Sequence, residues 1–156
     1  MQAALADFAK SCQCAAMTPA ARLSAVIEVL SDLEQRPRPV NDALKDWALS
    51  RRFAGSGDRA AIGAMVHDAL RKRSSARYVM GEDTARATAL GMLKVARSMD
   101  ATEIAVLCDG SRFSPEALSE VEVLALQSRT TDDAPAHIRG DYPEWLDASF
   151  ARVLGD

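Results

Sequence analysis

This chain of 156 residues has little of what extracellular or metal-dependent small domains usually contain. It has three cysteines, Cys12, Cys14 and Cys108, and an odd number in a short chain does not predict a disulfide framework. Cys12 and Cys14 lack a second Cys/His pair at a spacing typical of zinc sites, so we expect free thiols, no metal and a reducing, cytoplasmic setting. The two histidines, His67 and His137, have no nucleophile or orienting partner near them in the sequence, which argues against a general base.

Long apolar runs and β-strand patterns are also missing. No run approaches the roughly 18 apolar residues that a membrane-spanning helix needs. The N-terminus has no basic segment, and Asp7 interrupts its apolar part, so no secretory signal is predicted. Aromatic residues make up 5% of the chain, and no segment alternates apolar and polar residues long enough to predict a strand.

Helical spacing of apolar residues dominates what remains, and it predicts an all-α bundle of six to seven helices. Thr18-Pro19 is typical of a helix start, because Thr caps well and Pro is preferred at the first helical position. Further helices are predicted over about 40–53, from an Asp58 cap to about Met80, from Asp83 or Thr84, from Thr102, and from Ser114 or Ser119. The stretch 128–141 predicts a loop, and Pro143–Leu154 predicts a last helix.

Positive charge is concentrated in one stretch, Ser50–Met80, although the formal net charge of the chain is -3. The stretch holds seven cations and two acids, Asp58 and Asp68. Such a concentration attracts a polyanion, and the planar guanidinium of arginine matches phosphate. The candidate RNA contacts are Arg51, Arg52, Arg59, Arg71, Lys72, Arg73 and Arg77.

The same charges also fit a plainer interpretation, that of solvated helix ends. Arg71, Lys72 and Arg73 fall in a last helical turn, where a cation contributes about a few tenths of a kcal/mol through the helix dipole. Few aromatic rings lie near them in the sequence, only Phe53 and Tyr78. We therefore expect contacts that position structured RNA, rather than sequence-specific reading of single strands.

The two tryptophans, Trp47 and Trp145, lie at helical spacing with leucine neighbours, which predicts core or domain-interface anchors. The last helix is too short to be stable alone. We expect it to pack on the bundle or on a following domain through Trp145, Leu146 and Phe150.

Three segments together resemble a known family. The run Asp58–Arg73, DRAAIGAMVHDALRKR, resembles the helix that reads roughly D+..I..LVYGVLR+ in the NusB-like N-terminal domain of Sun-type (Fmu) 16S ribosomal RNA cytosine-5 methyltransferases. The segments Arg22–Trp47 and Arg51–Arg59 look like the opening of that domain. Gly140–Leu146, GDYPEWL, is similar to the P.WL element that leads into the methyltransferase domain, so the resemblance covers about residues 17 to 156.

The resemblance implies a NusB-like bundle followed by a catalytic domain that binds S-adenosylmethionine. This sequence contains neither a Gly-rich cofactor loop after a strand nor a Pro-Cys nucleophile motif. Cys108 lies in an apolar helix and does not match that motif. We therefore expect no catalytic residue and no cofactor in this chain, with S-adenosylmethionine bound only by a catalytic domain that is absent here.

The expected organisation is an N-terminal extension over 1–16, the bundle over 17–127, and a connector with a helix over 128–156. The favoured function is that of the RNA-binding N-terminal domain of a ribosomal RNA (cytosine-5) methyltransferase, itself inactive, which positions ribosomal RNA by phosphate contacts. The alternative is a protein-interaction bundle that docks a catalytic domain or another protein and does not contact RNA. Neither function involves a membrane or a metal.

Overall fold

All regular structure in the computed structural model is helical within residues 16–154, the part of the chain that it describes. Residues 1–15, with Cys12, Cys14 and nearly all of the predicted extension, lie outside this range. The all-α fold class predicted from the sequence is confirmed for the described residues. The elements are α2 (Pro19–Gln35), α3 (Val40–Ser50), α4 (Ser56–Arg71), α5 (Arg73–Met80), α6 (Ala85–Arg97), α7 (Ala101–Leu107), α8 (Glu120–Ser128), α9 (Ala136–Gly140), the 3-10 helix η1 (Glu144–Leu146) and α10 (Asp147–Leu154).

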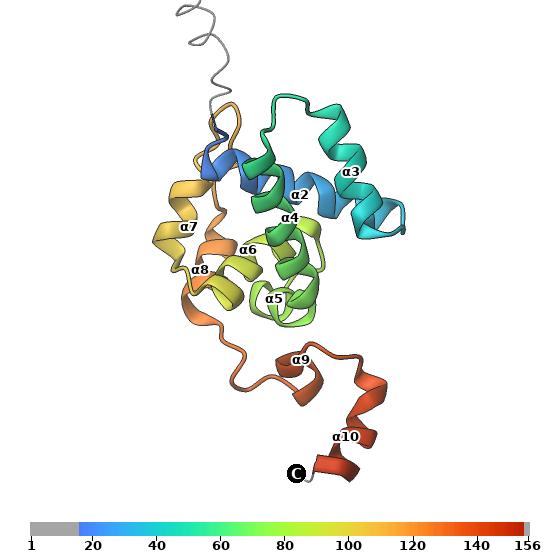
Figure 1. Ribbon diagram of the computed structural model, residues 1–156. Helices are drawn as coiled ribbons and strands as arrows, with labels where there is room; N and C mark the ends of the chain where they lie inside the picture. Colours follow the sequence, from blue (N-terminus) through green and yellow to red (C-terminus); the bar gives the residue numbers. More distant parts are fainter. Residues whose placement is uncertain (1–15, 155–156) are drawn as a thin grey trace, which may run out of the picture.

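Helix α6 lies at the centre of the bundle, and α2, α4, α5 and α7 pack around it (Figure 1). Nearly every residue from Ala85 to Leu93 is buried, so α6 has no solvent-exposed face along this length. A helix that is apolar on all sides is stable only inside a core. By contrast α2 buries a single stripe that includes Leu23, Val26 and Leu30, the spacing expected for a helix with one face on the core.

Three of the sequence-predicted helix starts are confirmed in detail. Thr18 and Thr84 cap α2 and α6, each with its hydroxyl accepting a backbone N–H one turn on. Of the two starts considered for the sixth helix, Ser119 is the one used, and it forms a capping box with Glu122.

Two other sequence predictions are wrong, and a third, the last helix, is present but with a different first turn. The helix predicted from Asp58 to Met80 begins two residues earlier, after Gly55, and is broken at Lys72 into α4 and α5. The predicted loop over 128–141 contains α9. The last helix starts with a 3-10 turn before α10. The reasons lie in contacts between segments that are far apart in the sequence.

Residues 129–154 leave the bundle as a tail. Figure 1 shows α9 and α10 beyond the end of the bundle, joined to α8 by an extended connection. Helix α9 packs on α5, whereas α10 packs mainly on η1. In the described range, no helix combines the length and the apolar character required to cross a membrane.

The tightest approach in the bundle is between α5 and α6. A Cβ atom added at Gly91 would lie 2.3 Å from the carbonyl oxygen of Ala76 and 2.7 Å from its Cα. Contacts this short with backbone atoms are relieved only by separating the two helices. Gly63 in α4 differs, because its added Cβ would meet only the Leu44 side chain, at 3.8 Å.

We predict that Gly91→Ala destabilises the fold by about 2 kcal/mol, since it overpacks the α5–α6 contact. Gly63→Ala is the matched control and gains up to about 1 kcal/mol from the better helix propensity of alanine. Urea unfolding followed by circular dichroism measures both free energies. Equal unfolding midpoints for the two variants would contradict the close approach.

Candidate functional site

The seven candidate RNA contacts do not form one continuous surface. Arg51 and Arg52 lie just before α4 and Arg59 lies in its first turn, whereas Arg71 is its last residue and the other three follow it. Helix α4 has 16 residues, which corresponds to about 24 Å. The basic stretch of the sequence is therefore divided between the two ends of this helix.

Four of the seven cations form ion pairs with carboxylates. Arg51 pairs with Glu28, and Arg71 pairs with Asp68 at 3.1 Å. Lys72 pairs with Asp141 at 3.3 Å. Each of these carboxylates neutralises a positive charge that the sequence analysis assigned to phosphate.

Arg77 is the most strongly engaged of the four. Its guanidinium pairs with Glu34 and Asp83, and its Nε donates to Thr88 Oγ1 at 2.7 Å. Burial lowers the pKa of Arg77 from its ordinary value, and the nearby charge of Arg73 acts in the same direction. With a side chain only 15% exposed, Arg77 supports α2 and α6 rather than facing a ligand.

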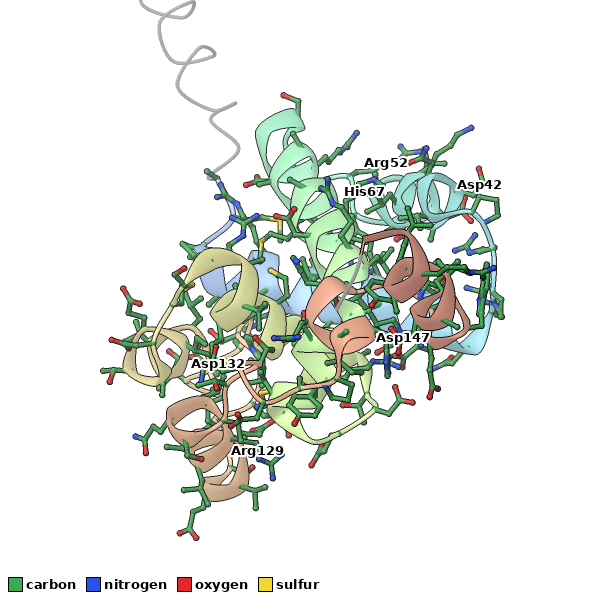
Figure 2. All side chains as sticks on the ribbon, turned by 90° about the horizontal axis from the view of Figure 1, so that it is seen from below. Asp42, Arg52, His67, Arg129, Asp132 and Asp147 are labelled. Carbon is green, nitrogen blue, oxygen red and sulfur yellow. The ribbon has the colours of Figure 1, made fainter. Side chains whose placement is uncertain are left out.

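Arg52, Arg59 and Arg73 are exposed and have no carboxylate within ion-pair distance among residues 16–154. Arg59 keeps one contact, from its Nε to the carbonyl oxygen of Ala54 at 2.9 Å. Figure 2 shows Arg52 on the same side of the molecule as His67, whereas Arg129 lies on the opposite side. Of the seven candidates, these three are therefore the cations that remain available for phosphate.

The sequence predicts Asp58 as a helix cap, but in the structure its side chain joins two helices instead. Its carboxylate is buried and accepts the backbone N–H of Met17 at 3.2 Å and the Arg22 Nε at 2.9 Å. The Met17 N–H and the Arg22 guanidinium hold the pKa of Asp58 below its usual value of 3.8, against the opposing effect of burial. These contacts tie the beginning of α2 to the first turn of α4.

Asp141 is the functional residue that the sequence analysis missed. Its carboxylate accepts the backbone N–H of Ser75 at 2.9 Å and the Ser75 hydroxyl at 2.8 Å, in addition to its ion pair with Lys72. The Ser75 N–H therefore bonds to a side chain from 66 residues further on, instead of continuing the helical ladder. This cap explains why the predicted single helix breaks at Lys72 and why α9 forms against α5.

The tail is also held by a cluster of its own. Asp147 accepts the Tyr142 hydroxyl at 2.7 Å and lies 3.0 Å from His137 Nδ1. The Tyr142 hydroxyl, followed by His137, lowers the pKa of the Asp147 carboxyl below its usual value. The Tyr142 ring packs edge-on against Phe150, with centroids 4.8 Å apart. His137 therefore has a partner that its position in a predicted loop did not reveal.

The three predicted docking residues share this tail but differ in exposure. Trp145 is 76% exposed, Phe150 is 38% exposed and Leu146 is partly buried. Val153 in α10 adds a second strongly exposed apolar side chain. Trp47, in contrast, is a buried core residue, as one of the two predicted roles for the tryptophans required.

Cys108 is a buried free thiol, and burial raises its pKa, which favours the unreactive protonated form. No group of three or more His, Cys, Asp or Glu side chains within residues 16–154 is arranged to hold a metal ion. His67 is exposed on α4.

No protein-family model, curated protein or solved structure matches this chain.

We predict that Asp58→Asn removes a pH-dependent part of the stability. The folded-state pKa of Asp58 is lowered, so its contribution is present above the unfolded pKa and is lost as the pH falls through the folded value. The stability difference between the native chain and the variant should be full at neutral pH and shrink below about pH 4. Urea unfolding at a series of pH values measures it.

Asp132→Asn is the control, because Asp132 is exposed and its side chain forms no ion pair within the described residues. A difference for Asp58→Asn that is the same at pH 7 and pH 2.5 would show that the ionised carboxylate is not what stabilises this contact.

Proposed function

We propose that this chain is a non-catalytic helical domain of a ribosomal RNA (cytosine-5) methyltransferase, and that its tail docks on the catalytic domain. The resemblance of Asp58–Arg73 and Gly140–Leu146 to the NusB-like domain of Sun-type enzymes supports the family. S-adenosylmethionine would be bound by the catalytic domain alone. The buried free thiol of Cys108 is in keeping with a cytoplasmic setting.

The observation that carries this proposal is that Trp145 is exposed on a segment held in place by hydrogen bonds. Asp141 fastens the tail to α5, and Asp147 fastens its parts to one another. An exposed tryptophan on a rigid support loses little conformational entropy when it is buried by a partner, and tryptophan is among the commonest binding hot spots. The tail therefore has the character of a preorganised docking element.

A second contact, with RNA, is favoured by a separate observation. Arg52 and Arg59 lie together around the start of α4, are exposed and have no carboxylate partner in the described range. Guanidinium groups free of carboxylates remain available for phosphate, and their binding releases counterions from the nucleic acid. Figure 1 shows the start of α4 at the end of the bundle opposite the tail, so the two contacts would not compete.

For docking, we predict that the chain binds a Sun-type catalytic domain supplied as a separate polypeptide, and that Trp145→Ala weakens this binding at least tenfold. Asp141→Ala should also weaken it, because it frees the tail from α5. Isothermal titration calorimetry measures the affinities. Val106→Ala is the control, since Val106 is 72% exposed but lies on α7. Equal affinities for Trp145→Ala and Val106→Ala would contradict docking through the tail.

For RNA, we predict salt-dependent binding of a small-subunit ribosomal RNA fragment. Removing two phosphate contacts with Arg52→Ala and Arg59→Ala together should weaken binding and reduce the slope of log K against log salt by about two. Fluorescence anisotropy at several salt concentrations measures this slope. Arg36→Ala is the matched control, because Arg36 is exposed but paired with Asp32. Absence of binding at low salt would leave only the docking role.

A further inference from the structure

A groove of about 520 Å³ opens where the start of α2, the end of α3 and the loop after α7 meet. These segments lie together at the upper end of the bundle in Figure 1. The volume is within the range of small-ligand sites. Among the lining residues are Thr18, Trp47, Arg51, Phe53, Arg112 and Phe113.

Two of the lining side chains are phenylalanines that remain largely in solvent. Phe53 is 59% exposed and Phe113 is 67% exposed. They belong to separate loops, one between α3 and α4 and the other between α7 and α8, so only the tertiary structure places them on one groove. Exposed apolar rings gathered around a concave surface are typical of binding sites.

One of the two rings is accompanied by an arginine. The Arg112 guanidinium lies 5.1 Å from the centroid of the Phe113 ring, a cation–π arrangement. Arg51 also lines the groove, but its guanidinium pairs with Glu28. The groove thus presents an aromatic ring on each of two loops and the positive charge of Arg112 beside one of them.

The polar groups at the bottom of the groove are satisfied within the protein. Trp47 is only 8% exposed, and its Nε1 donates to the Glu28 carboxylate at 3.1 Å. The same carboxylate pairs with Arg51, so the negative charge of Glu28 is neutralised. No unpaired carboxylate among the lining residues would repel a phosphate.

We propose that this groove binds single-stranded RNA, with unpaired bases stacked on Phe53 and Phe113 and with Arg112 beside a phosphate. The inference rests on the RNA contact proposed above and extends it to the bases. Stacking on aromatic rings combined with nearby cations is the usual way that proteins hold single strands, because every base has a π-face. An apolar peptide would contact the rings but would supply no negative charge to Arg112.

The test uses a Trp145→Phe background, in which Trp47 is the only tryptophan and reports on the groove by its fluorescence. The probes are an eight-nucleotide oligouridylate and an abasic oligonucleotide of the same length. We expect Phe53→Leu and Phe113→Leu each to weaken oligouridylate binding about tenfold and to leave binding of the abasic strand unchanged. Oligouridylate should also change the Trp47 fluorescence.

Leu124→Ala serves as the control, because Leu124 is 63% exposed on α8 outside the groove. Unchanged oligouridylate binding by both phenylalanine variants, with weaker binding by Arg112→Ala, would overturn base stacking while keeping phosphate contact. No binding of either probe at low salt would overturn both. Binding of an apolar peptide that both phenylalanine variants weaken, with RNA binding unchanged in the same variants, would identify the groove as a peptide site and overturn the inference.

Discussion

The carboxylate of Asp141 determines how the second half of this molecule is arranged. It accepts the N–H and the hydroxyl of Ser75 and pairs with Lys72, so it ends one helix and begins the next. Because Asp141 belongs to the tail, the same contact fastens α9 against α5. Without it, α5 would lack a cap for its first turn, and the exposed Trp145 would have no fixed position relative to the bundle.

Ion pairs reduce the positive charge that the basic stretch presents on the surface. A sequence with seven cations in thirty-one residues suggests one positive surface, but folding brings Glu28, Glu34, Asp83 and Asp141 to three of them. A fourth cation, Arg71, pairs with Asp68 of the same stretch. A paired guanidinium must lose its carboxylate before it can bind phosphate. The unpaired charge of the basic stretch therefore lies at Arg52 and Arg59, around the start of α4, and at Arg73, which lines a pocket together with Ile138 of the tail.

The proposed RNA contact and the proposed docking tail lie at opposite ends of the molecule. The segments that line the groove lie at the end of the bundle where α2 and α4 begin, and Figure 1 shows the tail at the other end. The central helix α6 connects them through a core with little freedom to shift, as the backbone contact at Gly91 shows. A rigid spacer between an RNA contact and a docked catalytic domain would hold the two at a constant separation.

Local interactions explain what the sequence determined by itself. Thr18, Thr84 and Ser119 cap helices through contacts within three residues, and Leu23, Val26 and Leu30 repeat along one helical face, so the all-α class could be predicted. The tertiary structure alone decided the break at Lys72, the ion pairing of Arg77 and the placement of Phe53 and Phe113 on one groove. Each of these depends on a partner brought from another helix or loop, and the spacing of residues along one segment carries no information about which distant side chain will meet it.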